Sequence, residues 1–255
     1  MTTSLPITER PAARVPAVAR AVSLLDLLAR ERRPMSMSGL AAALKLPRSS
    51  VHGLCGTLLD CGYLRRVDNG ALQIGPGVMT LAAAFVASTH VAAEFDALWR
   101  EVPAPDETLI LSVLNGPDVV YVGVRNSARP LGLAFSLGMR LPAWVAGTGK
   151  AMLAWLPPEE VRALVPAGAT DLDALLADLT RTRERGYAVD DGHVREGVYS
   201  IAAPVLDAAG RPVAGIAVCL NQATVDADKL ERQQRLVTQA ARTLSRRLGA
   251  REDTR

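Results

Sequence analysis

Two short stretches in the second half of the chain hold the residues best suited to metal or phosphate chemistry. The first, DDGHVRE, gathers four possible metal ligands, which are Asp190, Asp191, His193 and Glu196. Carboxylate and imidazole groups bind metals, but this spacing matches no standard metal site. We therefore interpret the stretch as a solvated acidic loop and expect no metal. The second, GTGKA at 147–151, is not a phosphate-binding P-loop, because Trp144 and Ala151 replace the required glycine and hydroxyl residues.

Catalytic motifs are also incomplete. The stretch AFSLG at 134–138 lacks the first glycine of a nucleophile elbow, and the expected strand–turn–helix context is missing. The chain has three histidines and no paired acid–base motif. We therefore expect that the protein is not an enzyme and uses no cofactor.

A third stretch has the chemistry of contact with a polyanion. Residues 44–66 read LKLPRSSVHGLCGTLLDCGYLRR. Apolar residues at i, i+3, i+4, i+7 and i+8 predict the buried face of a helix, formed by Val51, Leu54, Cys55, Leu58 and Leu59. Small side chains let the opposite face approach a groove floor, and N–H groups at a helix start favour phosphate. That opposite face carries Arg48, Ser49, Ser50, His52 and Gly53.

Two further helices are expected before this one. Residues 18–30 place apolar side chains at helical spacing. After a break at Pro34, either Ser36 or Ser38 is expected to cap a second, short helix. The connection between the second and third helices is a tight turn, and Pro47 suits the first turn of the third.

A hairpin is expected after the third helix. Gly62 is suited to end that helix, and the following residues to 75 read as two short strands that turn at 68–70. Three helices and a hairpin make a winged helix-turn-helix over residues 15–76, with the third helix in the major groove of DNA. The residues expected to contact DNA are Arg20, Ser36, Pro47, Arg48, Ser49, Ser50, His52, Thr57, Arg65 and Arg66. Taken singly, the two arginines or the two adjacent serines also fit an ordinary solvated surface.

The charge distribution agrees with this division. Residues 1–80 carry 10 Lys and Arg against 5 Asp and Glu, whereas residues 81–228 carry 11 against 18. A basic front and an acidic middle indicate a polyanionic partner for the front alone. The three cysteines, Cys55, Cys61 and Cys219, form no paired motif and fit a reducing cytoplasm. No secretory signal and no apolar run of about 18 residues is found, so no membrane span is expected.

The rest of the chain predicts a linker helix and an α+β domain. Residues 76–101 read as one long helix, assigned to a linker over 77–102, that joins the domains and packs against its copy in a second subunit. Residues 103–250 alternate strands with helices, including a strand–turn–strand around Asn115-Gly116 and a terminal helix from 226 to 249. These patterns predict one mostly antiparallel sheet with helices packed against it.

Several motifs resemble the IclR family of bacterial transcriptional regulators. They are VARAVSLLDLLA, LPRSSVHGLCGTLLDCGYL, RLPAWVAGTGKAMLAWL and RERGYAVDDGHVREGVYSIAAPVLDAAGRPVAGIAV, in the family's order. The resemblance covers about Val15 to Leu248. It implies a GAF/profilin-like fold for the second domain and an effector site at Leu133, Leu141, Gly147, Thr148, Asp190, Val198, Ser200, Ala217 and Cys219. One departure is Gly53, where the family usually has arginine.

The residues allow two functions. The first is a cytoplasmic transcription factor, more often a repressor in this family, that binds a double-stranded operator as a homodimer or homotetramer. A small organic or aromatic acid would control it, docking where Gly147, Thr148 and Gly149 precede a helix and leave N–H groups for an anion. The second is a metabolite-binding module or enzyme whose DNA-binding head has degenerated. Gly53, where the family usually has arginine, is the feature that keeps this second function open.

Overall fold

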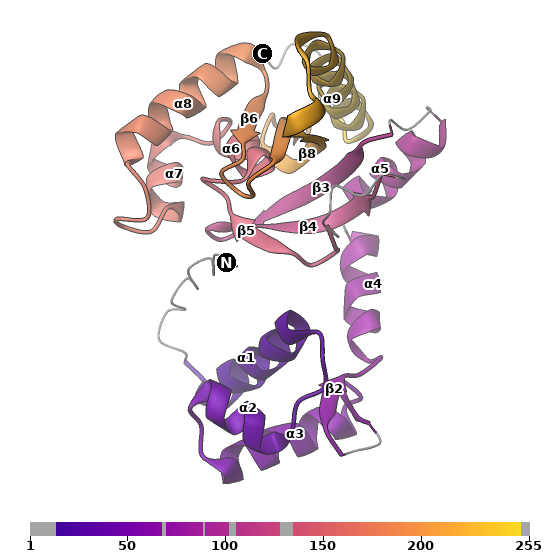
Figure 1. Ribbon diagram of the computed structural model, residues 1–255, viewed down its shortest axis with the longest axis vertical. Coiled ribbons are helices and arrows are strands. Elements are labelled where there is room, and N and C mark those ends of the chain that lie inside the picture. Colours follow the sequence, from indigo (N-terminus) through magenta and orange to yellow (C-terminus); the bar gives the residue numbers. More distant parts are fainter. Residues whose placement is uncertain (1–13, 68–69, 89, 102–105, 128–134, 251–255) are drawn as a thin grey trace. The chain divides into compact units, whose positions relative to one another are not determined.

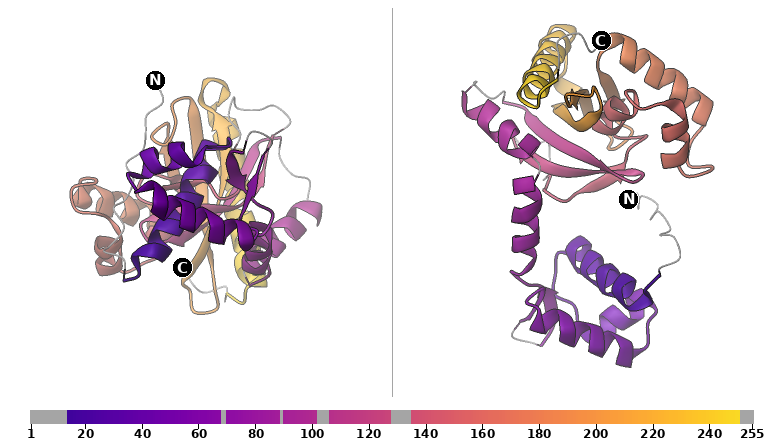
Figure 2. Two further views of the ribbon diagram at one scale, coloured as in Figure 1. Left: turned by 90° about the horizontal axis from the view of Figure 1, so that it is seen from below. Right: turned by 180° about the vertical axis from the view of Figure 1, so that it is seen from behind.

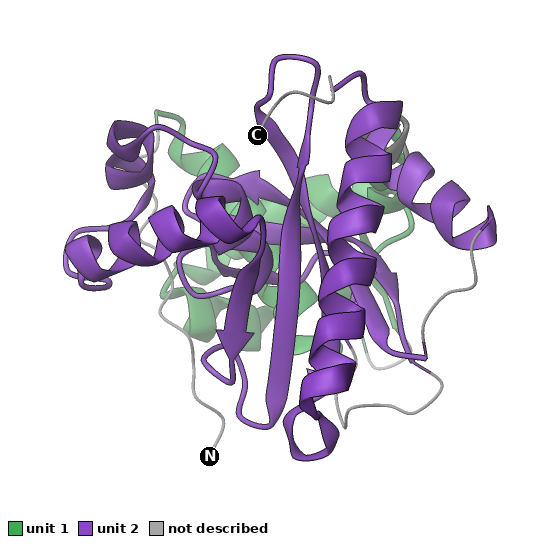
Figure 3. Cartoon of the chain, turned by 90° about the horizontal axis from the view of Figure 1, so that it is seen from above, with its two compact units in different colours: residues 1–88 green, residues 89–255 purple. Residues whose placement is uncertain are grey.

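The chain folds into two compact units, described here from a computed structural model. Unit 1 comprises residues 1–88 and unit 2 residues 89–255 (Figure 3). The structure describes residues 14–67, 70–88, 90–101, 106–127 and 135–250. Each unit is considered by itself below.

Unit 1 packs helices α1, α2 and α3 together with a hairpin, and α4 follows the hairpin (Figures 1 and 2). Its elements are α1 (Pro16–Glu31), α2 (Met37–Leu44), α3 (Arg48–Asp60), β1 (Leu64–Arg66), β2 (Leu72–Ile74) and α4 (Val78–Ser88). The predicted apolar face of α3 is buried at Val51, Cys55 and Leu58, against Leu24 and Leu40 of the first two helices. The winged helix-turn-helix expected from the sequence is confirmed.

Local signals place these elements as predicted. The Ser36 hydroxyl caps α2 by accepting a hydrogen bond from the Gly39 N–H at 3.1 Å. Beyond α3, Gly62 adopts a positive φ of 75°, and the Tyr63 N–H donates to the Leu58 carbonyl at 2.9 Å. The chain can therefore leave the helix directly into β1. Two residues of the predicted hairpin turn, 68 and 69, lie outside the described residues.

The predicted single helix over 76–101 is described as two helices, α4 and α5 (His90–Glu101), with residue 89 outside the described residues. The second of them is part of the core of unit 2, because Phe95, Leu98 and Trp99 are buried there against the sheet. Its sequence alone shows an apolar stripe, and a stripe does not reveal whether its partner is a sheet or a second subunit.

Unit 2 is built on one antiparallel sheet with strand order β5-β4-β3-β8-β7-β6. The strands are β3 (Thr108–Asn115), β4 (Asp118–Arg125), β5 (Arg140–Pro142), β6 (Ala188–Asp191), β7 (Val198–Leu206) and β8 (Pro212–Asn221). Helices α6 (Gly147–Leu153), α7 (Pro158–Leu164) and α8 (Leu172–Arg185) share one apolar cluster with one face of the sheet. Helices α5 and α9 (Ala227–Arg247) share a second cluster with the other face. The α+β domain predicted from the sequence is confirmed.

Some boundaries differ from the prediction. Helix α6 already begins at Gly147, so the GTG stretch forms its first turn rather than a preceding loop. Asp171 is the residue before α8, and its carboxylate accepts from the N–H groups of Asp173 and Ala174. In the described parts of the chain, no helix has the length and hydropathy needed to cross a membrane.

Candidate nucleic-acid interface and ligand pocket

The outward face of α3 is exposed. Arg48, Ser49, His52 and Thr57 are exposed to solvent, and Ser50 is half-buried. Pro47 is also exposed and occupies the position just before the helix. The residues predicted to face DNA are therefore accessible, and none of them is part of the apolar core of unit 1.

The start of α2 borders the same face. A shallow groove is lined by Met37, Ser38, Arg48 and His52, so α2 contributes two residues that sequence reasoning did not single out. Their only sequence signal was Ser38 as a candidate cap. That role falls to Ser36, whose oxygen also lies 3.0 Å from Ser38 Oγ. The hydroxyl of Ser36 is thus engaged within the turn of the motif.

The hairpin holds two arginines beside this surface. Leu64 is buried and anchors β1, whereas Arg65 and Arg66 are exposed. Arg65 lies opposite Gln73 across the two-stranded ladder. Arg20 is exposed on α1. Helices α1 and α3 and strand β1 therefore present cations to solvent, as binding to a phosphate backbone requires.

Two glycines of α3 also lie toward open space. A Cβ added at Gly53 or at Gly56 would meet no atom within 4 Å. Neither glycine is therefore required for packing inside unit 1. Their effect is to lower the profile of the helix and its intrinsic helix propensity.

Unit 2 contains a small, partly open cavity between the sheet and α6. In the ladder, Cys219 of β8 lies opposite Thr108 of β3 and Ser200 of β7, and Ser200 lies opposite Asp190 of β6. Side chains directly opposite one another project to the same face, so residues distant in the sequence converge here. The cavity is lined by Ile110, Tyr121, Phe135, Ala146, Gly147, Thr148, Asp190, Val194, Arg195, Val198, Ser200, Ala217 and Cys219.

Asp190 is the buried acid of this cavity. It is 3% exposed, and its Oδ1 accepts from the His193 N–H at 2.9 Å and the Val194 N–H at 3.3 Å. Burial raises the pKa of its carboxyl, while those two N–H groups and the charges of Lys150 and His193 oppose the rise. Asp190 therefore gives the cavity a buried carboxyl group, and the N–H groups of its own loop partly offset the cost of burying its charge.

The sulfur and phenol groups of the cavity are uncharged. Burial raises the pKa of the Cys219 thiol to about 12, and burial also raises the pKa of the Tyr121 hydroxyl. A neutral thiol is a poor nucleophile. Cys219 is thus a small, uncharged residue in the wall of the cavity.

The first turn of α6 approaches the sheet closely. A Cβ on Gly147 would lie 2.8 Å from Ser200 Oγ, so glycine is needed for the helix start to reach the strand. Thr148 is 4% exposed, and its hydroxyl has no hydrogen-bond partner. A buried hydroxyl without a partner is costly, so the Thr148 hydroxyl could bond to a polar group placed in the cavity.

The structure brings together most of the residues that the resemblance assigned to the effector site. Gly147, Thr148, Asp190, Val198, Ser200, Ala217 and Cys219 all line the cavity. Leu141 is buried in the adjacent apolar cluster but is not among the lining residues. Leu133 lies outside the described residues. The acidic loop, interpreted as solvated, is divided, because Asp190 is buried whereas Asp191, His193 and Glu196 are exposed.

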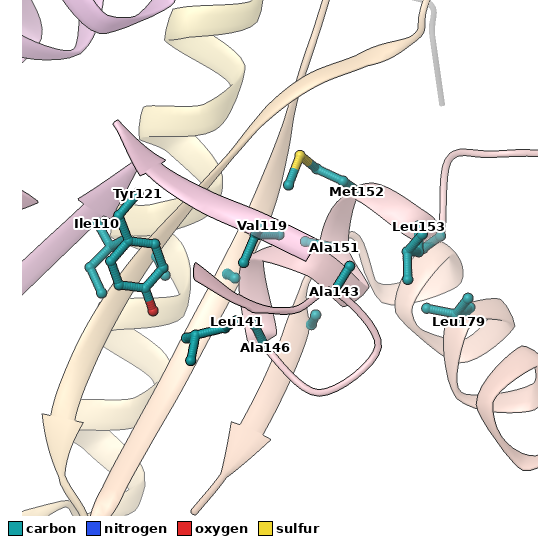
Figure 4. Close-up of a cluster of buried hydrophobic side chains, with 14 of the residues drawn as sticks. Ile110, Val119, Tyr121, Leu141, Ala143, Ala146, Ala151, Met152, Leu153 and Leu179 are labelled. Carbon is teal, nitrogen blue, oxygen red and sulfur yellow. The ribbon is translucent and has the colours of Figure 1, made fainter. Parts of the chain in front are cut away.

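Several lining residues were not predicted, and Tyr121 shows why. The β3–β4 ladder has a bulge at Leu111/Ser112, so that Gly123 faces Leu111 and Tyr121 faces Ser112. Val122 is the extra residue. If side chains alternated strictly from Val124, Val122 would face the cavity and Tyr121 would face the opposite side of the sheet. The bulge reverses these two orientations. Figure 4 shows the Tyr121 ring beside Ile110 in the buried cluster.

The cavity is nearly filled by its own walls. Its volume is about 20 Å³, which is close to the space that one ordered water needs. A ligand larger than water therefore requires the lining residues to move apart.

A winged helix-turn-helix joined in one chain to a sheet unit with a small pocket is the arrangement of the one-component transcriptional regulators. This class of protein pairs a DNA-binding head with a ligand-binding domain. The family model for the IclR helix-turn-helix domain matches residues 17–68, and the model for the bacterial transcriptional regulator IclR C-terminal domain matches residues 83–246. The chain belongs to the IclR family of transcriptional regulators.

Relatives and solved structures agree along nearly the full length. The transcriptional repressor AllR of Salmonella typhi is 30% identical over 246 residues, which cover 91% of this chain and 90% of AllR. The crystal structure of the Agrobacterium tumefaciens repressor BlcR is 36% identical, with a TM-score of 0.58, and covers 94% of this chain and 100% of its own. An IclR homologue from Microbacterium hydrocarbonoxydans was solved with 4-hydroxybenzoate. The match has a TM-score of 0.72 and covers 91% of this chain and 99% of the homologue. At 21% sequence identity, this match shows a shared fold.

Proposed function

We propose that this regulator binds a double-stranded operator with α3 and the hairpin of unit 1. The exposure of Arg48, Ser49 and His52 on one face of α3 carries this proposal. Small side chains there allow the helix to enter a major groove, and the arginines of β1 contact phosphates beside it. Gly53 removes one possible contact to phosphate or guanine, so Arg48 and the hairpin supply more of the affinity.

Unit 2 binds a small organic acid in the cavity beneath α6. The cavity walls are mostly apolar, with Thr148, Asp190 and Ser200 as buried polar groups and Arg195 as a cation at the edge. The unpartnered Thr148 hydroxyl is the observation that supports a ligand. The N–H groups in the first turn of α6 and the Ser200 hydroxyl suit the oxygens of the acid.

Ligand and DNA are coupled only if the ligand binds the DNA-free and DNA-bound arrangements with different affinity. Repression relieved by the acid is the proposed mode, supported by the repressors AllR and BlcR among the relatives. The regulator acts in the cytoplasm as a homodimer or homotetramer. Because operator symmetry mirrors the symmetry of the protein that reads it, the operator is roughly palindromic.

One titration tests the DNA-binding half. The full chain is added to its own promoter DNA at increasing salt, and affinity is expected to fall steeply because counterions are released. Arg48→Ala and Arg65→Ala are each expected to lower the slope of log affinity against log salt by about one. Absence of binding even at low salt would favour the alternative, a metabolite-binding module or enzyme with a degenerate head.

A second experiment tests the ligand half. Small carboxylic acids are screened by thermal shift, since a ligand that binds only the folded state raises the melting temperature. Acids that raise it are then added to the protein–promoter complex, where DNA affinity is expected to change. Acids that bind without any effect on DNA would contradict the regulatory coupling.

A further inference from the structure

The pocket of unit 2 is lined in part by a loop that belongs neither to the sheet nor to α6. This loop, residues 192–197, connects β6 to β7 and contributes Val194 and Arg195 to the lining. The cavity has a volume of only about 20 Å³, and packed protein interiors leave little other space. A ligand can therefore enter only if one of the walls moves.

The other described walls are packed tightly. The lining strands β3, β4, β7 and β8 are each hydrogen-bonded to a neighbouring strand on both sides. Helix α6 touches the sheet through backbone atoms, since a Cβ on Gly215 would lie 2.7 Å from the Thr148 carbonyl oxygen. Phe135 is buried, with its ring centroid 6.3 Å from that of Tyr121. Movement of any of these walls would disrupt the sheet or its core.

The loop, by contrast, has little buried apolar surface. His193, Arg195, Glu196 and Gly197 are exposed. Val194 is half-buried and packs against the apolar cluster that surrounds the cavity. Segments with few buried apolar contacts open locally at a low cost in free energy. The loop is therefore the described wall that can open most easily.

Asp190 fastens the loop to the pocket. Its Oδ1 accepts from the His193 N–H at 2.9 Å and from the Val194 N–H at 3.3 Å, and Asp190 itself lines the cavity. At the far end of the loop, the Gln222 N–H donates to the Gly197 carbonyl at 3.0 Å. Opening would exchange these hydrogen bonds for bonds to water and would leave the ladders of the sheet intact.

A glycine in the left-handed conformation lies at each end of the loop. Gly192 has a φ of 77° and Gly197 a φ of 79°. Glycine adopts such angles freely, whereas other residues are strained there. A Cβ on Gly197 would meet no atom within 4 Å, so the backbone conformation, not packing, favours glycine at this position. The chain between the two glycines can change direction at both ends.

We propose that residues 192–197 form a lid over the ligand pocket, which opens about Gly192 and Gly197 and is held closed by Asp190. This inference rests on the proposed function of unit 2 and adds the route by which the ligand enters. When the lid opens, Val194 leaves the pocket, and the vacated space enlarges a cavity that otherwise has room for about one water.

Cys219 reports the opening of the lid without any ligand, because it lines the same cavity and is 3% exposed. Alkylation of the full-length protein by iodoacetamide under native conditions is followed by mass spectrometry of the cysteine peptides. Gly197→Ala strains the closed loop, and we expect it to speed the alkylation of Cys219 about fivefold. Cys55, which is buried in unit 1, is expected to react at the wild-type rate.

Gly168→Ala is the matched control. Gly168 also has a positive φ, of 75°, and a Cβ there would meet no atom within 4 Å. It lies between α7 and α8 and does not line the cavity. The same backbone strain is therefore expected to leave the alkylation of Cys219 unchanged. Equal acceleration in the two variants would indicate global unfolding, and either that result or no acceleration in Gly197→Ala would overturn the lid.

Val194→Ala keeps the lid testable if Gly197→Ala does not fold. It removes the half-buried side chain of the loop and is expected to speed the alkylation of Cys219. Val113→Ala is its control, because Val113 is a half-buried valine that packs against the cluster on the other face of the sheet. The lid is excluded if the two valine variants react alike, or if Cys219 reacts only after the protein is unfolded.

The alkylation rates separate the lid from the proposed function, because they require no ligand. Faster alkylation in Gly197→Ala alone supports the lid, even if the thermal-shift screen finds no acid and the acid-binding function fails. Acids that bind a protein whose Cys219 alkylation is unaffected by Gly197→Ala and Val194→Ala would leave the acid-binding function standing and would exclude the lid.

Discussion

The surface of unit 1 that we propose binds DNA and the cavity of unit 2 hold their side chains in opposite environments. Arg48, His52 and Arg65 are exposed, while Thr148 and Asp190 are 4% and 3% exposed. On the surface of unit 1, the side chains proposed to contact DNA are separate from the core that maintains the fold. In unit 2 the same atoms that would bind a ligand also fill the core, so binding and stability are coupled.

Glycine-to-alanine changes give the largest contrast between the two regions. A Cβ on Gly149 would overlap the backbone of Ala143. We expect Gly149→Ala to lower the free energy of unfolding of unit 2 by about 3 kcal/mol, at the upper end of the usual overpacking cost. Thermal unfolding of the full chain measures this. An unchanged melting temperature would show that α6 is not held tightly against the sheet.

Removing a cation from unit 1 should affect DNA binding alone. We expect Arg48→Ala to weaken promoter binding about tenfold across sequences and to leave the melting temperature unchanged, because Arg48 is exposed. Fluorescence anisotropy with labelled DNA measures the affinity. Arg162→Ala, which removes an exposed arginine of unit 2, serves as the control and is expected to bind as the wild type. A loss of stability in Arg48→Ala would contradict the separation of function from fold.

The buried acid of unit 2 should make stability depend on pH. Burial raises the pKa of Asp190 above its ordinary value of 3.8, so the folded state holds this proton more tightly than the unfolded state does. Its stabilising contribution is present below pH 3.8 and is lost as the pH rises through the raised pKa. Asp190→Asn, which stays neutral, is therefore expected to gain stability relative to the wild type as the pH rises through the raised pKa of Asp190. Melting curves of both proteins that run parallel across this range would refute the prediction.

The smallest expected effect is a gain of stability in unit 1. A Cβ at Gly53 meets nothing within 4 Å, so Gly53→Ala is expected to stabilise the fold by about 1 kcal/mol through helix propensity. Chemical denaturation measures the gain. A decrease would mean that the outward face of α3 is packed against another surface.

Much of unit 1 followed from the sequence, because its signals are local. The spacing of Val51, Cys55 and Leu58 predicted the buried face of α3, and Gly62 its end. Ser36 was one of two candidate caps, and the structure selects it. The exposed face of α3 then followed by elimination.

The pocket followed only in part. Family resemblance assigned Ala217 and Cys219 of β8 to the effector site, and both line the cavity. That resemblance did not identify Ile110, Phe135 or Arg195. Their sequence contexts resemble ordinary strand or loop residues.

The sequence by itself determined the order of the helices and strands, the exposed face of α3 and the division of charge between the two parts of the chain. Tertiary structure decided which residues meet at the cavity. Pairing of strands distant in sequence places Asp190, Ser200 and Cys219 side by side, and one extra residue in β4 turns Tyr121 inward. Periodicity reports only the face that a side chain occupies on its own element. Register and bulges are set by interactions between elements, which no local pattern encodes.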